Sequence, residues 1–297
     1  MKKILLVLLS VLALTHCTSK SEIGTKENPI KISLVPGQDT KLLQENGKKL
    51  EAYLEEKTGL PFDVTVPVNF VAVIEALGSK RADMAIMNTF GYLLAHEKYG
   101  AEAALTGVHK GRKVYWGQVI ARKDGPKSIR ELEGKTIAFV DPSSGSGFVL
   151  PTKLLKDQKV RPKEVVFAGR HDSVVTMVYQ KRVDAGATYH TPEDNGVPQD
   201  ARKLLLTQYP DIFEKVVIIA KTDPIPNDPV VFRKDFPPEL RKTIVEVIKK
   251  MMKDEQGGKI MYDLYYMDDF QDATHKDYES VEKMLLEIGK SAQDFVK

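Results

Sequence analysis

The chain has 297 residues, with 44 lysines and arginines against 41 aspartates and glutamates, and this small basic excess is spread along the sequence, which argues against a nucleic-acid partner. Hydrophobic residues make up 42% and charged residues 29%, a composition typical of soluble globular domains that excludes a disordered chain, a fibre and a multi-span membrane protein. The length suggests two domains, and the single cysteine excludes an internal disulfide and a cysteine-based zinc site.

Residues 1–16 are predicted to be a signal peptide. Two lysines precede an apolar run at 4–14, which is too short to span a bilayer, because a membrane-spanning helix needs about 20 apolar residues. The run ends at Leu14-Thr15-His16-Cys17, which resembles the lipobox of bacterial lipoproteins, although His16 stands where a small residue is usual. The resemblance implies an exported protein that is acylated on Cys17 and anchored by lipid to a bacterial membrane, facing the periplasm or the cell exterior. An ordinary signal peptide with an incidental cysteine is the alternative.

The polar residues 17–29 are expected to form a flexible tether. Strand-like and helix-like segments then alternate through two units, 30–118 and 119–222. The first unit has predicted strands at 30–35, 62–66 and 84–87 and predicted helices at 40–58, 71–77 and 88–98. The second has predicted strands at 119–121, 136–140, 165–167, 185–188 and 216–220 and predicted helices at 128–132, 148–155 and 173–179. Residues 223–297 are expected to return to the first lobe and to carry helices at 239–253 and 280–288.

This alternation predicts an α/β protein with two lobes, each a mainly parallel sheet flanked by helices. A cleft between two such lobes suits a small-molecule ligand, because open α/β sheets bind ligands beyond the carboxyl ends of their strands. Helix N-termini face the crevice there.

One loop, Asp141-Pro142-Ser143-Ser144-Gly145-Ser146-Gly147, follows a predicted strand and opens a predicted helix. Its small residues let a ligand approach the backbone, its serines offer hydroxyl groups, and the helix start offers unpaired N–H groups and a partial positive charge. These features predict an anion socket that needs no lysine or arginine, although the same composition also suits a loop that only turns the chain. The spacing differs from a P-loop, a dinucleotide fingerprint and a nucleophile elbow.

The segment 141–151 resembles the phosphonate-binding loop of the periplasmic phosphate/phosphite/phosphonate-binding proteins of ABC transporters. Seven further segments match that family in its order: 38–40, 71–77, 88–92, 114–118, 167–174, 183–189 and 225–231. The resemblance covers roughly residues 30–290 and implies a type II periplasmic binding protein. Such a protein is a monomer that captures a small oxyanion between its lobes and delivers it to an ABC permease. It uses no cofactor or metal and catalyses no reaction.

The resemblance also implies roles for individual residues of the second lobe. Ser144, Gly145 and Ser146 would hold the oxyanion through hydroxyl and backbone N–H groups. Tyr115 would donate its phenol O–H, and His171 would face the cleft from a helix N-terminus. Packing of the phenol and capping of the helix by the histidine are the alternatives that remain open.

Four more residues complete the expected site. Asn88 and Thr89, at another helix start, would contribute from the first lobe, and Tyr189 would line the cleft. Asp228 would accept a hydrogen bond from a protonated ligand oxygen or from a ligand amine, because a carboxylate beside an anion tolerates only a ligand that carries a proton or a positive group. Asn88 could instead be an N-cap and Asp228 a turn residue.

Two positions depart from the family pattern. Gly145 stands where the family usually has threonine, which removes a hydroxyl and is expected to leave space. Phe70 stands where a ligand-binding tyrosine is common, which removes a second hydroxyl. These changes favour a bulkier phosphonate, or a different oxyanion, over a tight fit to phosphite or phosphate.

Three other functions compete with this prediction. A receptor of the same fold could feed a sensor kinase instead of a permease. An enzyme built on His171, Asp172 and Ser173 is disfavoured, because neighbouring residues on a helix point in different directions. Binding of a metal through tyrosine, histidine and aspartate is the third alternative.

Overall fold

The computed structural model describes residues 22–37, 39–287 and 294. The predicted signal peptide, Cys17 and the start of the predicted tether lie outside this part. Residues 22–29 form turns closed by a hydrogen bond from Gly24 N to Asn28 O, and Ile23 packs against the first lobe, so this end of the expected tether belongs to the folded body. No helix of the described residues is both long enough and apolar enough to cross a membrane.

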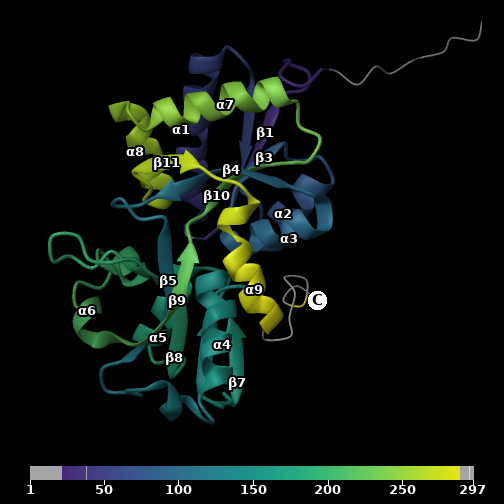
Figure 1. Cartoon of the computed structure of the whole chain (residues 1–297). Helices are drawn as coiled ribbons and strands as arrows, with labels where there is room; N and C mark the ends of the chain where they lie inside the picture. Colours follow the sequence, from purple (N-terminus) through teal and green to yellow (C-terminus); the bar gives the residue numbers. More distant parts are fainter. Residues whose placement is uncertain (1–21, 38, 288–293, 295–297) are drawn as a thin grey trace, which may run out of the picture.

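The chain forms two lobes, each built on its own sheet (Figure 1). The first sheet has the strand order β11-β4-β10-β3-β1-β2. Its strands are β1 (Ile30–Leu34), β2 (Phe62–Thr65), β3 (Met84–Ile86), β4 (Glu102–Val108), β10 (Pro229–Phe232) and β11 (Asp269–Asp272). The second sheet has the order β7-β6-β8-β5-β9. Its strands are β5 (Val114–Arg122), β6 (Thr136–Phe139), β7 (Glu164–Phe167), β8 (Ala185–His190) and β9 (Val216–Pro226).

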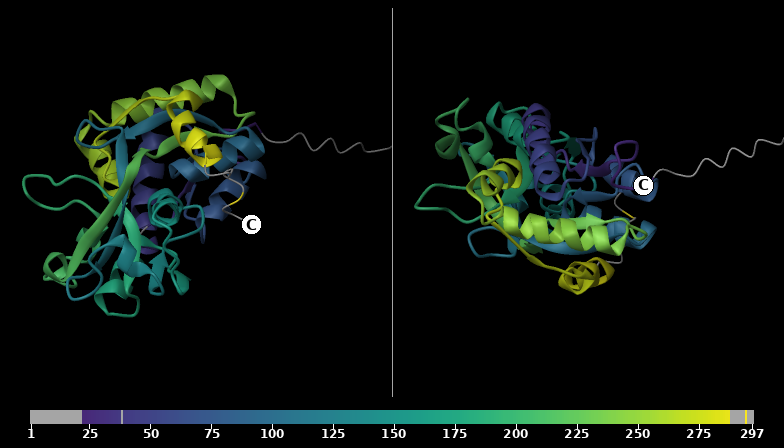
Figure 2. Two further views of the ribbon diagram at one scale, coloured as in Figure 1. Left: turned by 60° about the horizontal axis from the view of Figure 1, so that its bottom comes forward. Right: turned by 90° about the horizontal axis from the view of Figure 1, so that it is seen from above.

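Helices cover both sheets. The helices of the first lobe are α1 (Thr40–Thr58), α2 (Phe70–Gly78), α3 (Thr89–Tyr99), α7 (Pro238–Met251), α8 (Glu255–Tyr265), η4 (His275–Asp277) and α9 (Glu279–Glu287). Those of the second lobe are η1 (Ile129–Leu132), η2 (Gly145–Val149), α4 (Leu150–Asp157), α5 (His171–Tyr179), η3 (Ala201–Leu205) and α6 (Ile212–Lys215). Figure 2 shows α7 running across the end of the first lobe, above its sheet.

Local sequence signals explain where α1 begins and ends. The Asp39 carboxylate accepts a hydrogen bond from Leu42 N at 2.9 Å and caps the first turn. Gly59 ends the helix in the left-handed region (φ 71°), where its N–H donates to Glu55 O. The apolar stripe between these ends packs into the core of the first lobe.

The predicted α/β, two-lobed architecture is confirmed, but the sheets are mixed rather than mainly parallel. Parallel pairing joins β1 to β2 and β3 in the first sheet and β6 to β7 and β8 in the second. The remaining pairs, which involve β4, β5, β9, β10 and β11, are antiparallel. The cause is that the chain crosses between the lobes twice in opposite directions. The long strands β5 and β9 pair with each other in the second sheet, where the chain enters and leaves that lobe.

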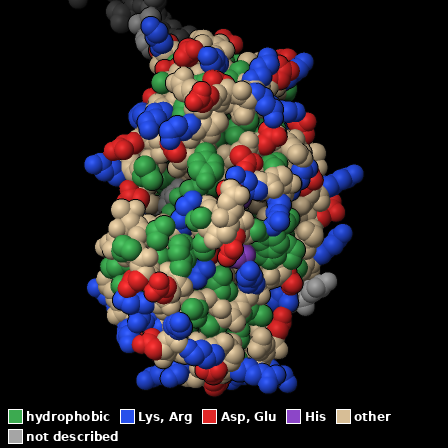
Figure 3. All heavy atoms as spheres, turned by 90° about the vertical axis from the view of Figure 1, so that its left-hand side faces the viewer, with side chains coloured by type: hydrophobic (Ala, Val, Ile, Leu, Met, Phe, Trp, Pro, Cys, Tyr) green, Lys and Arg blue, Asp and Glu red, His purple; other side chains and the backbone are tan. Residues whose placement is uncertain are grey.

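The first change of lobe therefore comes a few residues before the expected boundary at 118–119, and the second comes a few residues after the expected boundary at 222–223. Because β5 already pairs with β9 from Val114↔Pro226 onward, the chain changes lobe near 109–113 and again near 227–228. On the face seen in Figure 3, lysines and arginines are interspersed with acidic residues, and hydrophobic side chains gather around the waist between the lobes.

Candidate oxyanion-binding site

A cavity of about 140 Å³ lies between the two lobes, roughly ten times the space that one water molecule needs. Eight of the predicted site residues line it: Phe70, Asn88, Tyr115, Ser144, Ser146, His171, Tyr189 and Asp228. Two others, Thr89 and Gly145, do not. The two crossings of the chain bring these residues together from distant parts of the sequence.

The glycine- and serine-rich loop forms a socket at the carboxyl end of β6. The Asp141 carboxylate accepts from Ser143 N at 2.9 Å and from Ser143 Oγ at 2.7 Å, which fixes the turn. The Ser144 hydroxyl oxygen accepts from Gly147 N at 3.1 Å and caps η2, which leaves the hydroxyl hydrogen for another acceptor. The helix begins at Gly145, three residues earlier than predicted, and its first N–H groups have no partner within the helix.

The expectation that Gly145 leaves space in the socket is wrong, because Phe90 of the first lobe fills that space. A Cβ atom added to Gly145 would lie 2.5 Å from Cδ2 and 2.9 Å from Cε2 of the Phe90 ring. Phe90 is buried in the first turn of α3 and belongs to a hydrophobic cluster that also contains residues of the second lobe. The lost threonine hydroxyl is therefore replaced by a contact between the lobes.

Tyr115 on β5 lines the cavity together with Ser144 and Ser146 of the socket. Burial, with a smaller contribution from the Asp228 carboxylate, raises the pKa of Tyr115 well above its usual value. The phenol therefore keeps its proton and can act as a donor.

His171 is the first residue of α5 and lines the cavity, as predicted. Its Nδ1 lies 2.7 Å from Thr188 Oγ1, and its ring packs edge-on against Tyr189 with the centroids 5.0 Å apart. Burial lowers the pKa of His171 to about 3, so the imidazole is neutral near pH 7. In the tautomer whose Nδ1 accepts from the Thr188 hydroxyl, Nε2–H can donate to an anion.

On the first-lobe wall, Asn88 precedes α3 but makes no capping hydrogen bond. Its Nδ2 instead donates to Ser143 O at 2.7 Å, across the cleft. The predicted role of Thr89 in contacting the ligand is not supported, because its hydroxyl donates to Pro226 O at 2.6 Å and the residue does not line the cavity.

Asp228 lies at the second crossing, beside the cavity. Its carboxyl has no hydrogen-bond or ion-pair partner among the described residues, and burial raises its pKa to about 7. The neighbouring Asn227 amide donates to Gly107 O and Arg112 O, both at 2.9 Å, and so holds the two crossings together.

Sequence reasoning missed several residues that line the same cavity. These are His109, Thr191, Gln199, Tyr265, Tyr266 and others of the loops that follow β4, β8 and α8. Their loops carry no motif, and the strand that leads to His109 was not predicted, so only the tertiary structure brings them to the site.

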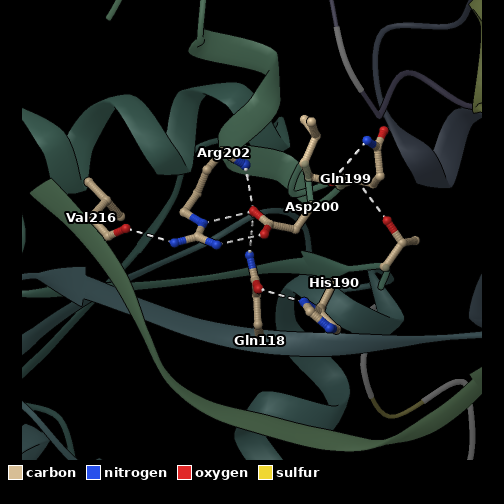
Figure 4. Close-up of polar contacts among 8 residues, drawn as sticks. Gln118, His190, Gln199, Asp200, Arg202 and Val216 are labelled. Atoms are coloured by element: carbon tan, nitrogen blue, oxygen red, sulfur yellow. Dashed lines mark hydrogen bonds and ion pairs between the residues drawn. The ribbon is translucent and has the colours of Figure 1, made fainter. Parts of the chain in front are cut away.

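A buried polar network supports the wall that carries Tyr189 and Gln199 (Figure 4). Arg202 Nη2 donates to Asp200 Oδ2 at 2.7 Å, and Arg202 Nη1 donates to Val216 O at 2.8 Å. Gln118 Nε2 donates to Asp200 Oδ1 at 3.2 Å, and Gln118 Oε1 lies 3.2 Å from His190 Nδ1. Burial alone would raise the pKa of Asp200, but the guanidinium and these hydrogen bonds hold it below its usual value.

None of the described residues that line the cavity is lysine or arginine, so any charge on its wall comes from other groups. The described residues also contain no group of three or more histidine, cysteine, aspartate or glutamate side chains placed to hold a metal ion. What the second-lobe wall offers is a set of neutral hydroxyl, phenol, imidazole and backbone N–H donors.

Two lobes joined by two crossings, with a cavity between them, form the type II periplasmic binding protein fold. A family profile described as "ABC transporter, phosphonate, periplasmic substrate-binding protein" matches residues 32–278. The chain belongs to this family, whose members are substrate-binding proteins of transporters rather than enzymes.

Characterised relatives and solved structures agree with that assignment. The chain is 27% identical over 180 residues to a phosphate-import protein PhnD of Mycolicibacterium smegmatis, an alignment that spans 56% of each chain. It is 23% identical over 237 residues to the phosphonates-binding periplasmic protein of Escherichia coli, covering 76% of this chain and 67% of that protein.

Two solved structures have the same fold. A binding-protein component of an ABC phosphonate transporter from Pseudomonas aeruginosa superposes with a TM-score of 0.77 at 19% identity, covering 90% of this chain and 87% of the other. PhnD1 from Prochlorococcus marinus, in complex with methylphosphonate, superposes with a TM-score of 0.74 at 18% identity, covering 88% and 98%.

Proposed function

We propose that this protein captures a phosphonate-class oxyanion in the cavity between its lobes and delivers it to an ABC permease without transforming it. The observation that carries the proposal is the wall of neutral donors around η2, where two serine hydroxyls, the Tyr115 phenol and the start of a helix face one cavity. Donors fixed in this way hold a tetrahedral oxyanion through charge-assisted hydrogen bonds.

The opposite wall restricts the charge of the ligand. The Asp228 carboxyl, with its pKa of about 7, is close to the expected oxyanion. It accepts a ligand that carries its own proton or an ammonium group and repels a fully ionised anion. An aminophosphonate meets this requirement through its ammonium group, and an alkylphosphonate meets it as the monoanion, which keeps one proton on an oxygen.

The named relatives support the ligand class. One is named for phosphate import, one for phosphonates, and one structure holds methylphosphonate. Gly145 and Phe70 replace a threonine and a tyrosine of the family pattern, so the site has two hydroxyl donors fewer. Phe90 fills the space beside Gly145. We therefore place phosphonates ahead of phosphate and phosphite as ligands of this chain.

Isothermal titration calorimetry on ligand-free protein tests the proposal with phosphate, phosphite, methylphosphonate and 2-aminoethylphosphonate. At least one phosphonate is expected to bind more tightly than either inorganic anion. A variant with Ser144→Ala and Ser146→Ala is expected to lose this binding, whereas Ser79→Ala, an exposed serine at the end of α2, serves as the matched control. Tight binding of phosphite with no binding of phosphonates would refute the proposal.

We further propose that the exported chain is a monomer attached to the membrane through an acyl group on Cys17. The lipobox-like sequence before Cys17 supports this attachment. Metabolic labelling with a fatty-acid probe is expected to mark the wild-type protein and not Cys17→Ala. Label that persists in this variant would refute acylation at the cysteine and would leave the ligand proposal untouched.

A further inference from the structure

His109 lies at the first crossing, directly after β4, and lines the ligand cavity. Its Nδ1 is 2.5 Å from the backbone carbonyl oxygen of Tyr266. A carbonyl oxygen can only accept a hydrogen bond, so Nδ1 carries the proton. The Asp268 carboxylate, with Oδ2 3.9 Å from the same nitrogen, favours this arrangement.

The other ring nitrogen of His109 is left without a partner. Nε2 is buried and forms no hydrogen bond within the described part of the chain. In the neutral ring with a proton on Nδ1, Nε2 is an acceptor. A buried polar atom without a partner destabilises the protein, and the contents of the cavity that His109 lines are the available source of a donor.

A second acceptor on the same wall is also unsatisfied. Asn88 donates through Nδ2 to Ser143 O, which assigns its other atom as the carbonyl oxygen, and this Oδ1 is buried with no partner among the described residues. The Asp228 carboxyl, described above, adds further acceptor atoms. The first-lobe wall thus presents acceptors, whereas the second-lobe wall, with Ser144 and Ser146, presents donors.

We propose that His109 is a specificity-determining residue, whose Nε2 accepts a hydrogen bond from a hydroxyl or ammonium group on the organic substituent of the ligand. This inference rests on the proposed function, because it assumes that the oxyanion end of the ligand occupies the donors of η2. A ligand of this kind has a donor at one end and an anion at the other, and both walls of the cavity are then satisfied.

The variant His109→Asn isolates the role of Nε2. Asparagine places its amide nitrogen close to the position of imidazole Nδ1, so it retains a donor for the Tyr266 carbonyl and removes the acceptor. His109→Gln is the second variant, because its longer side chain restores a polar atom near the position of Nε2. Circular dichroism and thermal unfolding establish that both variants fold.

Three phosphonates of nearly equal size serve as probes: ethylphosphonate, 2-hydroxyethylphosphonate and 2-aminoethylphosphonate. Calorimetry at pH 7.5 measures the affinity of each for the wild type and both variants. In His109→Asn, affinity for the hydroxyl and amino ligands is expected to fall about 10- to 100-fold, the range for one hydrogen bond to a polar or charged partner. Affinity for ethylphosphonate is expected to change less than about two-fold, and His109→Gln is expected to recover part of the loss.

Two outcomes would overturn the inference. An equal loss for all three ligands would mean that His109 contacts the oxyanion itself, as an imidazolium. No loss for any ligand that the wild type binds would mean that the ring only packs against the crossing. If the wild type binds none of the phosphonates, the proposed function fails instead, so the two failures are distinguishable.

Discussion

Replacement of Asp228 by asparagine should stabilise the ligand-free protein in a way that depends on pH. The carboxyl faces the cavity without a hydrogen-bond or ion-pair partner in the described residues, and burial raises its pKa to about 7 from an ordinary value of 3.8. Asparagine has nearly the same shape and does not titrate. The variant therefore removes the cost of ionising this group inside the protein.

The size and sign of the effect follow from the two pKa values. Between about pH 4 and pH 7 the folded carboxyl keeps its proton whereas the unfolded one has lost it, so the free energy of unfolding falls as the pH rises through this range. Each unit of difference corresponds to about 1.4 kcal/mol, which sets an upper bound of about 4 kcal/mol; water in the cavity reduces this to roughly 2–4 kcal/mol.

Urea unfolding of wild type and Asp228→Asn, both refolded without ligand, measures this difference at pH 4.5, 6 and 8. The variant is expected to exceed the wild type by at most about 1 kcal/mol at pH 4.5 and by roughly 2–4 kcal/mol at pH 8. Burial lowers the pKa of His171 to about 3 and that of His190 to about 4. These two histidines therefore lower the free energy of unfolding of the wild type and of the variant as the pH falls. Both proteins share these histidines, and their contributions cancel in the difference.

An exposed aspartate on β9, Asp223, supplies the control variant Asp223→Asn, whose stability is expected to follow that of the wild type at every pH. A stability difference between Asp228→Asn and wild type that stays constant from pH 4.5 to 8, or that is largest at low pH, would refute the reasoning. It would mean that the carboxyl is solvated or paired in solution.

Three further predictions concern the socket and its support. Gly145→Ala is expected to abolish phosphonate binding in calorimetry, because the new methyl group meets the Phe90 ring, and the added change Phe90→Ala is expected to restore it. Loss of both hydroxyls in Ser144→Ala with Ser146→Ala is expected to weaken phosphonate binding at least 100-fold, at about 1.5–3 kcal/mol for each bond to a charged oxygen. Arg202→Met is expected to cost about 3–5 kcal/mol in urea unfolding, because it leaves a buried carboxylate without its guanidinium.

Each of these has an opposing result. Binding that survives Gly145→Ala would show that Phe90 does not press on the socket in the loaded state. An unchanged affinity in the double serine variant would move the oxyanion away from η2. A loss below about 1 kcal/mol in Arg202→Met would mean that the ion pair is compensated by water.

The elements and the socket could be predicted because they depend on local sequence. The apolar stripe of 40–58 is flanked by Asp39 and Gly59, and the helix has these bounds in the structure. The loop before η2 is similarly local: serine, glycine and a following helix make a turn whose N–H groups face outward. Most of the predicted site residues lie beside the cavity. They stand at the ends of helices and strands, and the alternation of strands and helices along the sequence predicts these positions.

The rest depends on contacts between segments far apart in the chain. The strands β4, β10 and β11 were not predicted, because they are held in the sheet by antiparallel pairing with segments that are far away in the sequence. The space at Gly145 could not be judged from the loop, because Phe90 reaches it from the other lobe. His109 stands in no motif, and only the pairing of its Nδ1 with Tyr266 O reveals that the other nitrogen is unsatisfied.

Closure of the lobes and selection of the ligand draw on the same interactions. Asn88 Nδ2 donates to Ser143 O, and His171 N lies 3.4 Å from Gly37 O, so the two walls touch at two places beside the cavity. When they meet, the donors of one wall and the acceptors of the other lose access to bulk water. A ligand that satisfies one wall alone leaves buried polar atoms on the other, each at a cost of about 1–3 kcal/mol. On the proposed function, we therefore expect the closed state to favour a molecule that is an anion at one end and a hydrogen-bond donor at the other. The described residues at the cavity wall include no lysine or arginine, which would attract any anion.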